Sequence, residues 1–184
     1  MNTVDTLYGK VPSHILTACK DLKLLVLDVD GVLSDGYVFM GNSGEELKAF
    51  NTKDGYGIKA VISEGVKVAV ITGRQSNIVE QRMRSLNVNY IVQGQENKSQ
   101  AIRAIMTELN CTKSSVASIG DDMPDIGLFD NSGIKVAVND AHPYILGQAD
   151  FVTSLAGGRG AVREFCDLIL MARGALYKQH SASV

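Results

Sequence analysis

The sequence contains no tryptophan, and aromatic residues make up only 6% of its 184 residues. A chain so poor in aromatic side chains offers few surfaces on which unpaired bases could stack. Its formal net charge of −2 is also of the wrong sign for a general binder of polyanions. These two features predict that nucleic acid is not a partner, although a small anionic substrate could still meet a local basic site.

Long apolar runs and clustered cysteines are also missing. No apolar run is long enough to cross a bilayer, and the amino terminus lacks a basic start followed by an apolar secretory segment, so no membrane partner is expected. The three cysteines, Cys19, Cys111 and Cys166, lie far apart with no CxxC spacing. An odd number of distant thiols favours a reducing, cytoplasmic setting.

What the sequence does contain is an alternation of short apolar runs and amphipathic segments. Buried strands are predicted at residues 24–27, 66–71, 90–92, 116–119 and 134–138, with a brief edge strand at 150–152. Helical patterns lie between these runs, and a final amphipathic helix begins near Val162. This order is typical of an α/β protein with a mainly parallel sheet covered by helices.

The chain is predicted to form a single domain over residues 22–176. An amphipathic lead-in helix is expected within residues 1–21, with Pro12 and Ser13 at its start, and a flexible tail at 177–184. Two strand-like runs flank the turn residues 41–44, which predicts a hairpin insertion at about 36–51. A hairpin placed directly after the first strand would stand over the carboxyl end of the sheet.

Two carboxylates end the first buried strand. Asp28 and Asp30 are one residue apart, and Gly31 follows at once. Ligands of open α/β sheets bind beyond the carboxyl ends of the strands. Two like charges against an apolar core are costly unless a cation or a shared proton relieves them. A solvated turn would account for Gly31 but not for the carboxylate pair, so a functional site is the favoured interpretation.

Polar side chains follow two further strands, namely Thr72, Gly73 and Arg74 after the second and Asp121, Asp122 and Asp125 after the fourth. In a parallel sheet these ends meet at one edge, and carboxylates without histidine or cysteine suit Mg²⁺. Thr72 and Gly73 are expected to open a helix whose N-terminus seats a phosphate. A metal, a phosphate seat and a carboxylate nucleophile together predict phosphoryl transfer through an aspartyl-phosphate.

Four motifs, in order, resemble those of the haloacid dehalogenase superfamily. Asp28–Val32 resembles motif I, Ile71–Arg74 motif II, Lys98 the motif III lysine, and Gly120–Asp125 motif IV. Each string is weak alone, but all four at strand ends form a strong signal. The resemblance implies a three-layer, Rossmann-like α/β core of the capless type, with a small β-hairpin insertion.

Three more segments narrow the resemblance. Residues 50–58, 93–98 and 156–164 are similar to the 3-deoxy-D-manno-octulosonate 8-phosphate (KDO 8-phosphate) phosphatase family. The resemblance covers roughly residues 22–176. It implies a Mg²⁺-dependent hydrolase of this sugar acid phosphate in lipopolysaccharide precursor biosynthesis. It also implies cytoplasmic homotetramers whose hairpins and tails cover neighbouring active sites.

The resemblance also implies roles for individual residues. Asp28 would be the nucleophile and a Mg²⁺ ligand, and Asp30 the general acid and base, with its backbone carbonyl as a second ligand. Asp121 would be the third protein ligand. Asp122 and Asp125 would hold metal-bound waters or orient Lys98.

Substrate contacts are implied in the same way. The transferring phosphoryl group would be bound by Thr72, Gly73 and Lys98. The sugar acid would be contacted by Asn51, Thr52, Lys53, Asp54, Gly55, Lys59, Arg74 and Arg82. Family members often carry arginine where this chain has Lys53 and Lys59. Lysine cannot donate two parallel hydrogen bonds to the carboxylate of the sugar acid as arginine can.

Several alternatives stay open. Arg74 and Arg82, eight residues apart on one expected helix, could share a face toward the substrate or could be solvated. Residues 157–160 lack the lysine of a phosphate-binding loop and are interpreted as a hinge or a tail-positioning segment. The enzyme could instead act on a nine-carbon 2-keto-3-deoxy acid phosphate. A non-catalytic assembly subunit is a third possibility, against which the intact Asp28 and Asp30 argue.

Overall fold

The central feature of the structure, a computed structural model that describes residues 2–178, is a parallel sheet. Its strands are β3 (Leu24–Leu27), β6 (Lys67–Ile71), β7 (Tyr90–Val92), β8 (Val116–Gly120), β9 (Ile134–Ala137) and β10 (Phe151–Val152). They lie in the order β10-β9-β8-β3-β6-β7, and every neighbouring pair is parallel. The predicted parallel sheet is therefore confirmed. The predicted flexible tail falls largely on residues 179–184, which lie outside the described residues.

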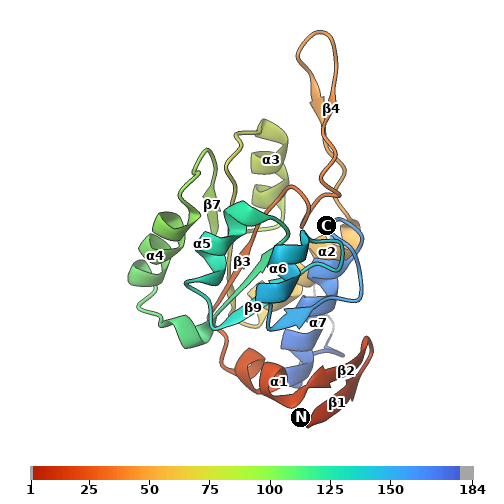
Figure 1. Ribbon diagram of the computed structural model, residues 1–184, viewed down its shortest axis with the longest axis vertical. Helices are drawn as coiled ribbons and strands as arrows, with labels where there is room; N and C mark the ends of the chain where they lie inside the picture. Colours follow the sequence, from red (N-terminus) through yellow and green to blue (C-terminus); the bar gives the residue numbers. More distant parts are fainter. Residues whose placement is uncertain (1, 179–184) are drawn as a thin grey trace.

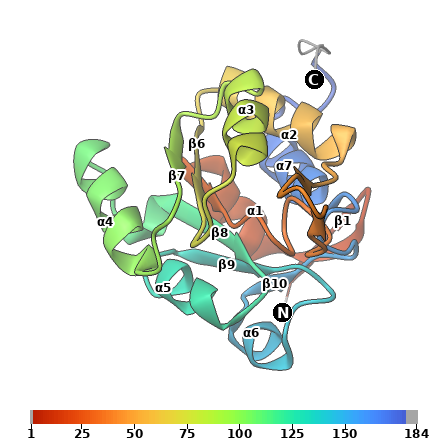
Figure 2. The ribbon, with the colours of Figure 1, turned by 90° about the horizontal axis from the view of Figure 1, so that it is seen from above.

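Helices cover both faces of this sheet, so the three-layer α/β prediction is also confirmed (Figures 1 and 2). One layer contains α1 (Ser13–Lys20), α2 (Thr52–Ser63), α3 (Asn77–Ser85) and α7 (Ala161–Ala172). The other contains α4 (Lys98–Glu108) and α5 (Ile126–Phe129), and α6 (Pro143–Gln148) packs against β9. Two short 3₁₀ turns, η1 (Lys113–Ser115) and η2 (Met123–Asp125), flank β8.

Strand β3 is buried on both faces and supplies both cores. Leu25 and Leu27 pack into the larger apolar cluster, and Leu24 and Val26 pack into the smaller one. This division follows from the alternation of side chains along a strand. Leu27 is paired with Val70 of β6 and Ile119 of β8, so these three strands end side by side.

The predicted hairpin insertion is present as β4 (Phe39–Met40) and β5 (Glu46–Leu47), an antiparallel pair. It projects from the domain beyond the carboxyl end of the sheet (Figure 1). Its apolar side chains face solvent in the single chain, with Phe39 61% and Met40 77% exposed.

The amino terminus differs from the expected lead-in helix. Helix α1 begins at Ser13, as the Pro12–Ser13 signal indicates, but the preceding residues form an antiparallel hairpin of β1 (Thr3–Thr6) and β2 (Gly9–Pro12). Long-range contacts stabilise it, because Val11 is buried in the core and the Tyr8 hydroxyl donates to Asp167 on α7 at 2.8 Å. Among the described residues, no helix combines the length and apolar character that a membrane span needs.

Candidate active site

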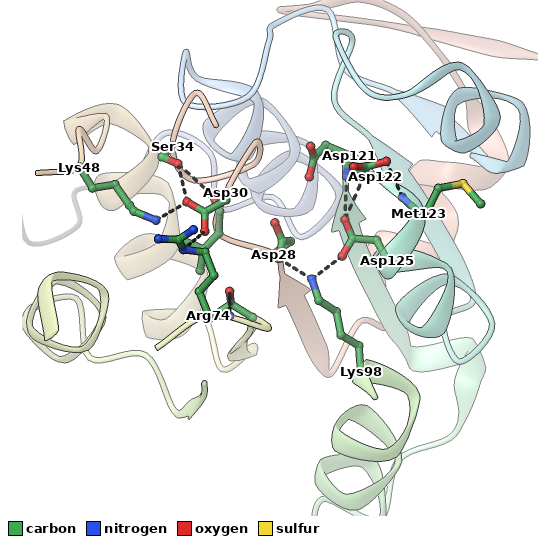
Figure 3. Close-up of polar contacts among 12 residues, drawn as sticks. Asp28, Asp30, Ser34, Lys48, Arg74, Lys98, Asp121, Asp122, Met123 and Asp125 are labelled. Carbon is green, nitrogen blue, oxygen red and sulfur yellow. Dashed lines mark hydrogen bonds and ion pairs between the residues drawn. The ribbon is translucent and has the colours of Figure 1, made fainter. Parts of the chain in front are cut away.

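A cavity of about 560 Å³ lies at the carboxyl ends of β3, β6 and β8. Its lining residues are Asp28, Asp30, Thr72, Gly73, Arg74, Glu96, Lys98, Asp121, Asp122, Pro124 and Asp125. The structure therefore brings together residues from all four sequence motifs, as the strand-end argument predicts. Figure 3 shows two groups of contacts there, one around Asp28 and Lys98 and the other around Asp30.

The first group is a cluster of carboxylates. Asp28, Asp121 and Asp125 each offer an oxygen within 4.8 Å of the others. Lys98, at the start of α4, donates to Asp28 at 2.5 Å and to Asp125 at 2.7 Å. The three carboxylates carry more negative charge than the single ammonium of Lys98 neutralises. A cluster of carboxylate oxygens that outnumbers its single cationic partner fits a small divalent cation.

Burial and crowding of the carboxylates raise the pKa values of Asp28 and Asp121. Burial, followed by the charge of Asp125, raises the pKa of Asp28 to about 7. Burial and the charges of Asp28 and Asp125 raise the pKa of Asp121 to about 8. Burial alone would lower the pKa of Lys98, but the two carboxylates that it contacts raise it above its ordinary value. The ammonium of Lys98 is therefore charged.

Asp125 is occupied by contacts within the protein. One oxygen accepts from Lys98, and the other accepts from the backbone N–H groups of Asp121 (2.9 Å) and Asp122 (3.3 Å). This arrangement favours the expectation that Asp125 orients Lys98. Asp122 is exposed, and its side chain caps η2 by accepting from the Met123 N–H at 2.7 Å.

Glycine is required at position 31 because the carboxylate of Asp121 lies very close to its backbone, and not only because the chain turns there. Its φ is +102°, and a Cβ at this position would lie 2.1 Å from Oδ2 of Asp121. Any larger residue would displace the carboxylate of Asp121. The glycine that follows the acidic pair therefore permits two strand ends to approach each other.

Asp30 does not point toward Asp28. After Val29 the chain turns, because the Val29 carbonyl accepts from the N–H groups of Leu33 and Ser34 at 2.9 Å each. The carboxylate of Asp30 contacts Lys48, which follows β5, and lies 3.9 Å from Nε of Arg74 (Figure 3). Lys48 was not among the residues predicted from the sequence, and the only signal for it was the expectation that the hairpin stands over the sheet edge.

The prediction that Thr72 and Gly73 open a helix is wrong, while phosphate binding by these two residues stays a prediction. Helix α3 begins only at Asn77, so Thr72 and Gly73 lie in a loop ahead of it. Thr72 is buried, and its hydroxyl accepts from the Arg74 N–H at 3.3 Å. The loop, rather than a helix end, contributes these residues to the cavity.

Seven of the residues predicted to contact the sugar do not line the cavity of the single chain, namely Asn51, Thr52, Lys53, Asp54, Gly55, Lys59 and Arg82. They lie on α2, its N-cap and α3, so Arg74 and Arg82 do not share one helix. Arg82 packs against Gly55, where a Cβ would lie 2.6 Å from its Nη2. Lys53 is exposed.

Asp54 is buried and connects two helices. It is only 1% exposed, and its carboxylate accepts from the backbone N–H group of Arg163 at 2.7 Å. Burial outweighs the hydrogen bonding and raises its pKa to about 6. Asp54 therefore connects α2 to the start of α7, and in the single chain it does not line the cavity.

The glycine-rich segment at 157–160 packs directly behind the acidic loop. A Cβ on Gly157 would lie 1.6 Å from the carbonyl oxygen of Gly31, and Gly158 donates its N–H to the Val32 carbonyl at 2.8 Å. These contacts show that the segment packs against the Asp28–Asp30 loop, and its interpretation as a hinge or a tail-positioning segment stays a prediction.

Comparisons with known proteins agree with this geometry. Residues 87–164 match the family model of haloacid dehalogenase-like hydrolases. The chain is 48% identical to the 3-deoxy-D-manno-octulosonate 8-phosphate phosphatase of Salmonella typhi, over 97% of this chain and 95% of that protein. A structure of such a phosphatase from Yersinia pestis superposes with a TM-score of 0.96 at 45% identity, covering 100% of this chain and 99% of that one.

A third relative was solved with ligands. The Moraxella catarrhalis 3-deoxy-D-manno-octulosonate 8-phosphate phosphatase, in complex with a magnesium ion, a phosphate ion and a KDO molecule, has a TM-score of 0.87 and 37% identity. The match covers 90% of this chain and 95% of that one.

Proposed function

The chain belongs to the 3-deoxy-D-manno-octulosonate 8-phosphate phosphatase family of haloacid dehalogenase-like hydrolases, and from this we propose that it hydrolyses KDO 8-phosphate to KDO and inorganic phosphate. The observation that carries the proposal is the Asp28–Lys98–Asp125 cluster beside Asp121, within the cavity that also contains Asp30. The product would serve lipopolysaccharide precursor biosynthesis.

Mg²⁺ fits the carboxylate cluster as cofactor. Asp28, Asp121 and the backbone carbonyl of Asp30 would hold it. Asp122 and Asp125 would hold waters bound to the metal or orient Lys98. When bound, the cation supplies charge neutralisation for the substrate phosphate and for the carboxylates around it. The proximity of the carboxylate oxygens of Asp28, Asp121 and Asp125 to one another is the observation on which the fit depends.

The residues of the chain divide the reaction into two steps. In the first, an Asp28 oxygen bonds to phosphorus while the bond from phosphorus to the sugar oxygen breaks, and Asp30 gives its proton to that oxygen. In the second, Asp30 takes a proton from water, whose oxygen bonds to phosphorus as the Asp28–phosphorus bond breaks. Lys98, Thr72 and Gly73 bind the phosphoryl oxygens, and Lys98 also fixes Asp28.

The sugar acid end would be recognised in an assembly. We propose a homotetramer, because Thr52 and Lys53, exposed at the start of α2, lie outside the cavity of their own chain and would meet the sugar of a neighbouring subunit. The apolar side chains of the β4–β5 hairpin are exposed in the single chain and would be covered by this association. The unpaired Cys19, Cys111 and Cys166 support a cytoplasmic location.

Replacing Phe39 and Met40 together by aspartate is expected to break the assembly into smaller species, because two buried charges would replace apolar contact area. Multi-angle light scattering after size exclusion measures the mass. Tyr144→Asp, at an exposed site on α6, serves as the control. A double variant that keeps the mass of a tetramer would contradict the role given to the hairpin.

A substrate panel tests the proposed activity. Phosphate release is measured with KDO 8-phosphate, with a nine-carbon 2-keto-3-deoxy acid phosphate and with simple sugar phosphates, each with and without Mg²⁺. We expect kcat/KM for KDO 8-phosphate to exceed the others by at least about 10-fold, the scale on which one carbon unit is discriminated. Equal rates across the panel would overturn the substrate assignment, and no release in Mg²⁺ would overturn the activity.

Metal stabilisation is expected to depend on pH. The folded pKa values of Asp28 (about 7) and Asp121 (about 8) lie above the ordinary value of 3.8, so the metal-free fold holds protons that the unfolded chain releases. Metal-free stability should therefore fall as pH rises from about 4 to about 8. Mg²⁺ replaces those protons, so the stabilisation of the fold by Mg²⁺ should increase over the same pH range.

Thermal unfolding in chelator and in excess Mg²⁺ checks this expectation between pH 5 and pH 8.5. The rise in Tm on adding Mg²⁺ should be larger at pH 8 than at pH 5 by at least about 3 °C, which corresponds to about 1 kcal/mol in a chain of this size. Asp121→Asn should reduce the difference. A metal-free Tm that increases steadily toward pH 8 would contradict the assignment.

A further inference from the structure

Four charged side chains form a closed ring at the edge of the cavity. Lys48 contacts Asp30 and lies 3.8 Å from Glu46, while Arg74 lies 3.9 Å from Asp30 and 4.0 Å from Glu46. Positive and negative groups alternate, so the ring is neutral. Two members come from the hairpin and two follow β3 and β6. The ring therefore connects the inserted hairpin to the ends of the catalytic strands.

Lys48 is the buried member of this ring. Its side chain is 0% exposed, whereas that of Arg74 is 52% exposed. Lysine is almost never fully buried unless it is paired, because its charge must leave water. The partner here is Oδ1 of Asp30, to which the Ser34 hydroxyl also donates at 3.4 Å. Figure 3 shows Lys48 reaching Asp30 from the side opposite Lys98.

We propose that Lys48 is a positioning residue for the general acid and base, an inference that rests on the proposed phosphatase function. Its ammonium and the Ser34 hydroxyl anchor Oδ1 of Asp30, so the carboxylate cannot rotate freely. This leaves Oδ2 to exchange the proton with the leaving sugar oxygen and later with water. Glu46 adds a negative charge 3.8 Å from the ammonium, without a hydrogen bond to it.

The arrangement makes the hairpin part of the catalytic apparatus of its own subunit. Lys48 follows β5 directly, so any displacement of the hairpin moves the ammonium away from Asp30. A general acid that is misplaced by about 1 Å can lose about 100-fold in rate. Lys98, which is proposed to bind the phosphoryl group, pairs with Asp28 and Asp125 and not with the hairpin, so substrate binding should be affected less.

The experiment compares Lys48→Met, Lys48→Arg and the control Lys20→Met, an exposed position at the end of α1. With KDO 8-phosphate and Mg²⁺, Lys48→Met should lower kcat about 10- to 100-fold and change KM less than about 3-fold. Lys48→Arg should recover part of kcat. Glu46→Gln should give a smaller loss of the same kind, and Lys20→Met should match wild type.

A second substrate separates positioning from a general structural defect. The p-nitrophenolate group leaves without needing a proton, so the first turnover of p-nitrophenyl phosphate does not need Asp30 as acid. The rate of its nitrophenol burst should change less than about 3-fold in Lys48→Met. An equal loss with both substrates, or an unchanged kcat with KDO 8-phosphate, would overturn the role of Lys48. A wild-type chain inactive on KDO 8-phosphate would instead overturn the proposed function.

Discussion

Replacing Asp28 by asparagine is expected to lower Mg²⁺-dependent release of phosphate from KDO 8-phosphate by at least about 10⁴-fold, the scale seen when a nucleophile is removed. The amide cannot form the acyl-phosphate, although it occupies nearly the same volume. The contact with Lys98 at 2.5 Å also loses its charge, but the Lys98–Asp125 contact at 2.7 Å keeps the ammonium in place.

The same variant should keep its fold, which makes the loss of activity interpretable. Burial already raises the pKa of Asp28 to about 7, so removing its charge relieves the metal-free cluster. The Tm in chelator should therefore equal or exceed that of wild type, while the stabilisation by Mg²⁺ shrinks. Asp130→Asn, at an exposed position, serves as the matched control. Asp28→Asn with more than about 1% of wild-type kcat would contradict the role of nucleophile.

The second large effect concerns backbone packing. Gly157→Ala is expected to destabilise the fold by about 3 kcal/mol and to lower kcat strongly, because its Cβ would lie 1.6 Å from the Gly31 carbonyl oxygen. Two backbone segments must separate to admit the methyl group. One of them is the loop that carries Asp28 and Asp30, so the damage to stability and to catalysis should occur together.

Gly147→Ala provides a matched control for this substitution. Gly147 lies within α6, and a Cβ there would meet no atom within 4 Å. Alanine at such a helical position is expected to be neutral or to stabilise by up to about 1 kcal/mol. Urea unfolding and steady-state kinetics on both variants check the contrast. Equal stability of the two variants would show that the 157–160 segment does not support the acidic loop.

Much of the architecture was predictable because its signals are local in the sequence. Apolar runs such as 24–27 and 116–119 are long enough to identify buried strands, and the topology of parallel sheets then places their carboxyl ends together. The strand ends alone predicted that Asp28 and Asp121 share one site, whereas Lys98 was added by the resemblance of its motif, and the structure places all three in one cavity.

The parts that sequence reasoning missed depend on contacts between distant residues. The hairpin at residues 3–12 is fixed by Tyr8 against Asp167, a pairing that no local periodicity reveals. Lys48 reaches Asp30 only because the chain returns to the strand ends at the base of the β4–β5 hairpin. The packing of Gly157 on Gly31 likewise joins segments that are more than a hundred residues apart in the chain.

The paired positions Leu27–Ile119 and Leu27–Val70 have a consequence for enzyme engineering. Neighbouring strands lie about 4.8 Å apart, so carboxylates that follow their ends come close to one another, as Asp28 and Asp121 do. Oδ2 of Asp121 already lies 2.1 Å from the position that a Cβ of Gly31 would take, so the longer side chain of Asp121→Glu would have little room beside the Gly31 backbone. Designers who wish to accommodate a larger cation should therefore shift whole strands and not lengthen individual side chains.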